Sequence, residues 1–284
     1  MARGISLHIG LNTVDPEHYN GWNGRLAACE FDANDMLAIA DVRGFDSEVL
    51  LTRSATAGAV TDAIRRASQE LTSGDFFFCT YSGHGGQVPD RNGEESPDGM
   101  DETWVLFDRQ LVDDELYSLW QGFEQGVRIL VLSDSCHSGT MTRDARAMFE
   151  AVVPMIVDRG IIDDQKPRTK DLPRSVQDAT YQQHRELYDD IQASNPTSDE
   201  VEVRAAVLLM SGCQDDQLSL DGNRNGLFTQ TLRHVWNDGG FSGRYRRFHK
   251  EILALMPPTQ TPNFFPLGTG TRAFSREQPF TISP

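Results

Sequence analysis

The sequence has few of the features that would place it outside a reducing aqueous compartment. It contains four cysteines in 284 residues and no Cys-x-x-Cys pair, so neither a zinc ribbon nor a disulfide framework is indicated. No apolar stretch is long enough for a signal peptide or a membrane span. We therefore predict a cytoplasmic protein whose cysteines are free thiols.

Basic residues are also scarce. Lys and Arg number 26 against 42 Asp and Glu, which gives a formal net charge of −16 and a pI near 4.8. Binding to phosphate groups needs concentrated Lys and Arg, so we predict neither nucleic acid nor membrane as a partner. An acidic surface would suit a cationic substrate, and the simpler interpretation is a solvated surface that keeps the chain soluble.

The order of apolar runs predicts an α/β fold. Runs of strand length alternate with segments of helical spacing, which implies a mostly parallel central sheet flanked by helices, an α/β/α sandwich. Three consecutive phenylalanines at 76–78 indicate a strand buried on both faces. The predicted strands are 5–11, 45–51, 76–81, 127–133, 204–211 and 261–267, and the predicted helices are 27–41, 56–71, 113–123, 226–236 and 245–256.

Two regions interrupt this pattern. Residues 145–203 are rich in Asp, Gln, Arg and Pro, and only 181–191 has helical spacing, so we predict an insert or linker that is partly flexible. The parts before and after it are expected to complete one domain. An acidic stretch containing Gly and Pro is predicted to be a loop over 87–102, followed by a short extended piece at 104–107.

Two short motifs carry the chemistry, and each follows a predicted strand. The first is Tyr-Ser-Gly-His-Gly-Gly-Gln at 81–87, and the second is Asp-Ser-Cys-His-Ser-Gly at 134–139. Ligands and chemistry collect at the carboxyl ends of the strands in such a sheet. We therefore predict that Cys136 is a nucleophile and that His84 is its proton carrier. The backbone N–H groups of Gly85 and Cys136 are the candidates for stabilising an oxyanion.

A structural alternative exists for each residue taken alone. A lone Cys or His in a tight turn is more often a buried structural residue than a catalytic one. The two together, each in its motif, favour catalysis. His137 is a rival base, but neighbours on an extended segment point apart, which favours His84. By the same alternation, Asp134 can point to the same side of the chain as Cys136.

The paired motifs resemble the His and Cys boxes of metacaspases, which are caspase-like cysteine peptidases of clan CD, family C14, with bacterial members often called orthocaspases. The resemblance runs from the first strand to the segment around 211–216 and leaves out roughly 145–200. It implies a caspase-like fold with a large-subunit-like (p20) catalytic region at 1–144 and a small-subunit-like (p10) region at 204–284. It also implies hydrolysis of peptide bonds after Arg or Lys in protein or peptide substrates, with no organic cofactor.

The resemblance also assigns a substrate pocket. Metacaspases line the pocket for the Arg or Lys side chain with residues that match Asp134, Ser82, Cys29 and Asp32 here. Two carboxylates facing one guanidinium give charge-assisted binding. For Asp32, the alternative is an ordinary helix cap or a surface acid.

An enzyme with this preference would find sites in its own insert at high effective concentration. We therefore predict self-processing within that insert, which would leave a large N-terminal piece and a small C-terminal piece joined through the sheet. The candidate positions are Arg159, Lys166, Arg168, Lys170, Arg174 and Arg185.

Calcium is the cofactor that the resemblance implies. Asp101, Asp113 and Asp114, with Asp98 and Glu102 nearby, lie in segments that resemble the activating calcium site of many metacaspases, and their oxygens are ligands that calcium prefers. The family pattern has a further acid seven residues after the nucleophile. This chain has an arginine at 143 and an aspartate next to it, and the alternative is a solvated acidic loop.

Two other hypotheses remain open on the sequence. One keeps the Cys and His but changes the specificity, as in other clan CD peptidases such as those like gingipain or separase. The other is a catalytically silent scaffold or regulatory protein with a caspase fold. Labelling by a peptide electrophile with Arg at its recognition position separates these hypotheses.

Overall fold

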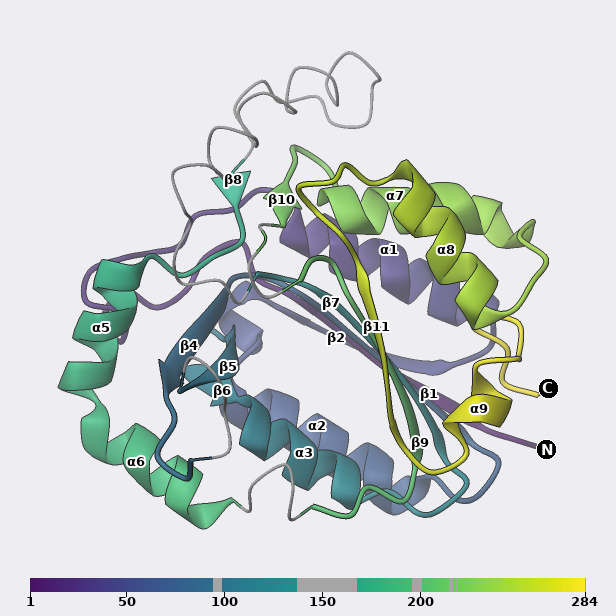
Figure 1. The fold of residues 1–284 in the computed structure, drawn as a ribbon, viewed down its shortest axis with the longest axis horizontal. Helices are drawn as coiled ribbons and strands as arrows, with labels where there is room; N and C mark the ends of the chain where they lie inside the picture. Colours follow the sequence, from purple (N-terminus) through teal and green to yellow (C-terminus); the bar gives the residue numbers. More distant parts are fainter. Residues whose placement is uncertain (94–98, 137–167, 196–200, 215–216, 218, 284) are drawn as a thin grey trace.

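A six-stranded sheet forms the centre of the molecule (Figure 1). The computed structural model describes residues 1–93, 99–136, 168–195, 201–214, 217 and 219–283. The strand order is β11-β9-β7-β3-β1-β2, and all neighbours are parallel except β11, which runs antiparallel to β9. The predicted α/β fold with a mostly parallel sheet is therefore confirmed. The six strands are β1 (Gly4–Gly10), β2 (Asp46–Leu51), β3 (Phe76–Ser82), β7 (Arg128–Asp134), β9 (Ala206–Ser211) and β11 (Asn263–Gly268).

Helices cover both faces of this sheet (Figure 1). On one face, Phe76 and Phe78 pack in the same apolar cluster as Phe228. On the other face, Phe77 packs in a cluster with Ile64. The prediction that β3 is buried on both faces is confirmed. The first face carries α1 (Cys29–Val42), α7 (Leu227–Trp236) and α8 (Tyr245–Leu255), with the short α9 (Thr271–Phe274) beside them, and the second carries α2 (Ala57–Glu70) and α3 (Asp113–Gln121).

A small antiparallel sheet stands beside the main one, in the order β4-β5-β6. Its strands are β4 (Gly85–Pro89), β5 (Met100–Val105) and β6 (Gln110–Val112). The predicted loop over 87–102 is wrong at both ends, because β4 continues to Pro89 and β5 begins at Met100. The glycines and polar residues of β4 carry no strand signal of their own, and pairing with β5 fixes its conformation.

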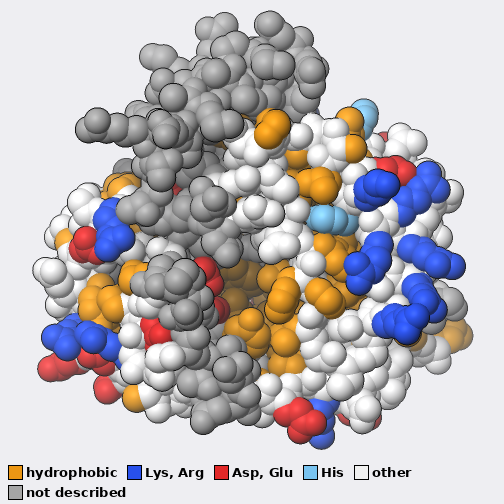
Figure 2. Space-filling view, viewed as in Figure 1, with side chains coloured by type: hydrophobic (Ala, Val, Ile, Leu, Met, Phe, Trp, Pro, Cys, Tyr) orange, Lys and Arg blue, Asp and Glu red, His pale blue; other side chains and the backbone are white. Residues whose placement is uncertain are grey.

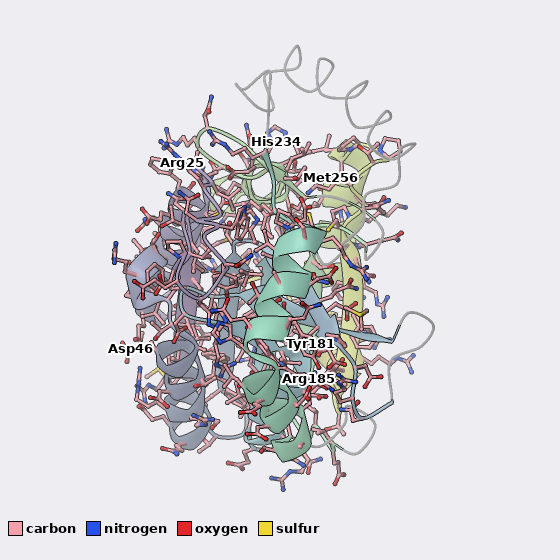
Figure 3. The ribbon with its side chains drawn as sticks, turned by 90° about the vertical axis from the view of Figure 1, so that its left-hand side faces the viewer. Arg25, Asp46, Tyr181, Arg185, His234 and Met256 are labelled. Atoms are coloured by element: carbon pink, nitrogen blue, oxygen red, sulfur yellow. The ribbon has the colours of Figure 1, made fainter. Side chains whose placement is uncertain are left out.

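Two helices pack against the small sheet where the sequence predicts one helix at 181–191. They are α5 (Arg174–Gln183) and α6 (Arg185–Ser194), and His184 between them has a non-helical backbone. Figure 3 shows the two helices in front, with the labelled Tyr181 and Arg185 close to their junction. The Tyr181 hydroxyl of α5 donates to Asp189 Oδ1 of α6 at 2.6 Å, which links the two helices, and Arg185 binds the same carboxylate within α6.

The strand ends define the site. Ser82 at the end of β3 pairs directly with Asp134 at the end of β7, so the residues that follow each strand start from neighbouring positions. Across this edge run two short paired strands, β8 (Arg168–Thr169) and β10 (Leu220–Asp221). On the face of Figure 2, a separate apolar hollow of about 290 Å³ opens where β5 and α3 meet β9 and β11.

Candidate active site

His84 follows β3 and is almost completely buried. Its Nε2 lies 2.9 Å from the carbonyl oxygen of Gly24, so the proton belongs on Nε2 and Nδ1 is left as the acceptor. Nδ1 makes no hydrogen bond of ordinary geometry to any residue that the structure describes. The Trp22 ring lies 4.7 Å from the imidazole ring between centroids. One loop thus supplies both the carbonyl and the ring that orient His84.

Cys136 lies two residues beyond β7 and is fully buried. Its Sγ donates to the carbonyl oxygen of Ser219 at 3.6 Å and accepts a hydrogen bond from the Ser219 N–H. The Ser219 carbonyl oxygen also accepts the backbone N–H of Lys170 at 3.0 Å. The sulfur is therefore placed next to Lys170. Within the described residues, no hydrogen bond joins the side chains of Cys136 and His84, and the rival base His137 lies outside the described residues.

Both reactive groups are held in their neutral forms. Burial lowers the pKa of His84 to about 4, the backbone carbonyls of Gly24 and Asp171 oppose that shift, and the charge of Lys170 adds to it. Burial raises the pKa of the Cys136 thiol, and the neighbouring Cys213 raises it further. At neutral pH the resting pair is therefore a thiol and an uncharged imidazole.

The backbone of Lys170 occupies the predicted oxyanion position. Its carbonyl oxygen accepts the N–H of Gly85 at 2.9 Å and the N–H of Cys136 at 3.1 Å. These two groups are the donors predicted from the sequence. They converge on the carbonyl of the bond between Lys170 and Asp171.

The Lys170 side chain enters the predicted substrate pocket and is completely buried there. Its Nζ lies 3.0 Å from Asp32 Oδ2 and 3.1 Å from Asp134 Oδ2, and it donates to Ser82 Oγ at 2.9 Å. Ser82 in turn donates to Asp32 at 2.7 Å. Cys29 is buried at the start of α1, and burial raises its thiol pKa while Lys170 lowers it, which places the thiol within reach of that charge. The structure thus brings together the four residues predicted to line the pocket.

Charge balance explains why a lysine can be buried there. Burial alone lowers the pKa of Lys170, but the nearby charges of Asp134 and Asp32 outweigh burial, and the net pKa is raised well above the usual value. Burial raises the pKa of Asp32, and the charge of Lys170 opposes it. The ammonium is therefore charged, with two carboxylates as counter-ions.

The sequence prediction missed the half of the pocket that comes from the C-terminal region. Ser219 Oγ and Thr229 Oγ1 donate to Asp134, at 2.5 and 2.9 Å, and Asn225 Nδ2 donates to Asp32 at 3.0 Å. The Gly226 N–H donates to both oxygens of Asp32. A side chain at Gly226 would come within 2.4 Å of Asp134 Oδ2 and of Lys170 Nζ, so only glycine fits. Ser219, Asn225 and Gly226 lie in short polar segments and Thr229 lies in the first turn of α7, and none of these positions carries a local signal in a single sequence.

The predicted calcium residues lie on two elements near this site. Asp101 is on β5, and Asp113 and Asp114 begin α3. Asp101 and Asp114 are buried, and Asp114 accepts a hydrogen bond from Asn92 at 2.9 Å. Among the described residues, no three His, Cys, Asp or Glu side chains converge closely enough to hold a metal ion. The described residues alone do not complete a cation site, and residues 98, 143 and 144, which the calcium hypothesis also concerns, lie outside the described ranges.

Comparison with known proteins agrees with the fold. The family model described as the caspase domain, Peptidase_C14, matches residues 13–270. Metacaspase-7 of Arabidopsis thaliana is 35% identical over 151 residues, which are 50% of this chain and 36% of that protein. Metacaspase-1 of Mycosarcoma maydis is 29% identical over 244 residues, which are 79% of this chain and 59% of that protein. The chain thus spans about one third to three fifths of the length of these relatives.

A solved structure matches along the whole chain. The crystal structure of protein GSU0716 from Geobacter sulfurreducens is 51% identical, with a TM-score of 0.86, and the match covers 99% of this chain and 100% of that one. The fold is therefore the caspase-like α/β fold. The chain belongs to the caspase-domain family of cysteine peptidases, and the predicted resemblance to metacaspases is confirmed. No helix in the described ranges has the length and apolarity needed to cross a bilayer.

Proposed function

We propose that this protein is a cysteine endopeptidase that cleaves after Lys or Arg with Cys136 and His84, and that its first substrate is its own Lys170–Asp171 bond. One observation carries the proposal. Lys170 lies in a pocket of two carboxylates while its carbonyl oxygen accepts the N–H groups of Gly85 and Cys136. A bound peptide substrate would present the same side chain and the same carbonyl.

The geometry supports a two-step hydrolysis. The Cys136 sulfur attacks the Lys170 carbonyl carbon and gives its proton to His84 Nδ1. The oxyanion that forms stays within reach of the Gly85 and Cys136 N–H groups. His84 then protonates the Asp171 nitrogen, the carbon–nitrogen bond breaks, and a thioester with Lys170 remains. Water hydrolyses the thioester, which releases the Lys170 carboxylate and regenerates the thiol.

Hydrogen bonds of the uncut protein support the starting positions of these groups. The Ser219 carbonyl contacts both the Cys136 sulfur and the Lys170 N–H, so the nucleophile begins beside the bond that it attacks. The Gly24 carbonyl fixes the proton on His84 Nε2 and leaves Nδ1 to move protons. The four cysteines of the chain are free, as this chemistry requires, and a reducing cytoplasm remains our prediction for the compartment.

The test compares self-cleavage in wild type with Cys136→Ala and His84→Ala. In wild type, we expect a new fragment whose N-terminus is Asp171, and cleavage of a peptide after Lys or Arg. In Cys136→Ala, both should be abolished, and in His84→Ala they should fall by about a hundredfold or more, because proton transfer is lost. Cys79→Ala is the matched control, since Cys79 is also buried and free but lies in the core.

The scaffold hypothesis has one observation in its favour, because Lys170 fills the pocket and would block other substrates. It predicts that wild type stays intact at Lys170 and is not labelled by a peptide electrophile with Arg at its recognition position. Fragments that appear equally in wild type and Cys136→Ala would indicate a contaminating protease and would contradict the proposal.

A further inference from the structure

The chain is held on both sides of the Lys170–Asp171 bond in an extended conformation. Before the bond, β8 pairs with β10, and the Lys170 N–H donates to Ser219. After it, the Leu172 N–H donates to the carbonyl oxygen of Gly85 at 2.8 Å. Gly85 thus donates its N–H to the residue before the bond and accepts from the second residue after it. Such main-chain pairing is how an extended peptide is added to a strand edge.

The Leu172 side chain fills an apolar pocket next to His84. Leu172 is completely buried, and it packs in one cluster with Val14, Tyr19 and Val105. Tyr19 donates its hydroxyl to the carbonyl oxygen of Leu106, so its polar end is satisfied elsewhere and its ring is presented to the cluster. The pocket therefore offers apolar contacts.

The same loop that orients His84 also builds this pocket. Val14, Tyr19 and Trp22 belong to the segment between β1 and α1, and Trp22 also packs against the cluster. That segment ends near Gly24, whose carbonyl holds His84 Nε2. The position of the pocket is therefore fixed relative to the reacting bond, two residues beyond it.

We propose that Val14, Tyr19 and Val105 form a substrate subsite that takes a branched aliphatic side chain at the second position after the cleaved bond. This inference rests on the proposed function and adds a second specificity determinant to the cationic pocket. In the uncut chain, Leu172 is the occupant. A substrate that binds after self-cleavage displaces Leu172, and a Leu, Ile or Val restores the buried contacts that a polar residue cannot.

The first experiment uses three internally quenched peptides that copy residues 168–173, Arg-Thr-Lys-Asp-Leu-Pro, with Leu, Gly or Asp at the fifth position. Self-processed wild type is the enzyme. We expect kcat/KM for the Leu peptide to exceed those for the Gly and Asp peptides by about tenfold or more, which corresponds to burying one aliphatic side chain. Equal values for the three peptides would overturn the subsite and leave cleavage after Lys intact. If the enzyme cuts none of the three peptides and also fails to cut a lysyl amide reporter, both proposals are overturned.

A second experiment locates the subsite in the protein. In Val14→Asp, the ratio of kcat/KM for the Leu peptide to that for the Gly peptide should fall towards one. A ratio measured within one variant does not depend on how much of the enzyme folds. Leu187→Ala removes a partly exposed leucine from α6 and should keep the wild-type ratio. An unchanged ratio in Val14→Asp would overturn the assignment.

Discussion

Lys170 brings a full positive charge into a position without solvent-exposed surface, and the two carboxylates bound to it make that possible. Removing one partner of a buried ion pair leaves the other charge uncompensated, which is more costly than replacing all partners together. Lys170 is therefore expected to stabilise the uncut molecule, in addition to its proposed role in marking the bond for cleavage.

This expectation can be measured without cleavage. In a Cys136→Ala background, Lys170→Met should lower the free energy of unfolding by about 3–5 kcal/mol, because Asp32 and Asp134 are left buried without a cation. Lys170→Arg keeps the charge and should lose much less. Urea denaturation of the three proteins at pH 7 makes the comparison. Equal stability of the Met and Arg variants would contradict the assigned ion pairs.

Buried histidines should make the fold sensitive to acid. His8 lies in β1 between Ser6 and Thr80, and burial lowers its pKa to about 3. Between about pH 3 and 6.5 the unfolded chain binds a proton that the folded chain does not, so stability rises with pH across that window and is lost as pH falls. The slope is about 1.4 kcal/mol per pH unit for one such group.

Comparing a His8 variant with its parent protein isolates the contribution of His8 to the pH dependence of stability. In the Cys136→Ala background, His8→Asn should reduce the loss of unfolding free energy between pH 6.5 and 5 by about 1–2 kcal/mol. Asp221, whose pKa burial raises, acts in the opposite direction in both proteins and cancels in the difference. Parallel stability–pH curves for the two proteins would show that His8 is not the group responsible.

At the level of secondary-structure elements, continuous apolar runs predicted the strands reliably. The strands with continuous apolar runs, such as β3 and β7, were predicted to within a residue or two because burial on both faces leaves a strong pattern. The strand β4 was missed because its glycines serve the active site and carry no strand preference. The break between α5 and α6 was missed because His184 is compatible with a helix and only the packing interrupts it.

The candidate site divides in the same way, into residues that a sequence pattern locates and residues that only the folded chain brings there. His84, Cys136 and Asp134 lie at or just past the ends of predicted strands, so their convergence could be inferred, whereas Asp32 was assigned to the pocket by the resemblance to metacaspases. Lys170 appeared in the sequence only as one of six candidate cleavage positions in the insert. Its selection depends on which residue the path of the chain delivers to the pocket, and no local pattern encodes that path.

The predicted effect of calcium also belongs to the scale of secondary-structure elements, because its candidate ligands lie on β5 and α3. If calcium binds near Asp101, Asp113 and Asp114, it should fix β5 against the start of α3 and raise the rate of self-cleavage. Titrating calcium into metal-stripped wild type, with magnesium as the control ion, measures this effect. Equal rates in chelator and in millimolar calcium would contradict the calcium hypothesis.

At the scale of the whole molecule, the distribution of strands decides what a single cut does. Cleavage after Lys170 would separate residues 1–170, with β1, β2, β3 and β7, from residues 171–284, with β9 and β11. The pieces would still share the six-stranded sheet through the β7–β9 pairing, and α5 and α6 would still pack on β4 and β6 through Gln177 and Tyr188. We expect the two pieces to remain together after cleavage.

Such a cut changes the molecularity of folding. The intact chain unfolds in a reaction of one molecule, whereas the cut protein becomes a heterodimer whose unfolding releases two chains. Its melting midpoint should therefore rise with protein concentration, since each tenfold change is worth about 1.4 kcal/mol of association free energy, while that of Cys136→Ala should not change. Thermal scans over about two decades of concentration test this, and a constant midpoint for the cut protein would contradict it. Proteolysis would then be a one-way step. Cut chains that separate at the β7–β9 pairing at low concentration must meet again to refold.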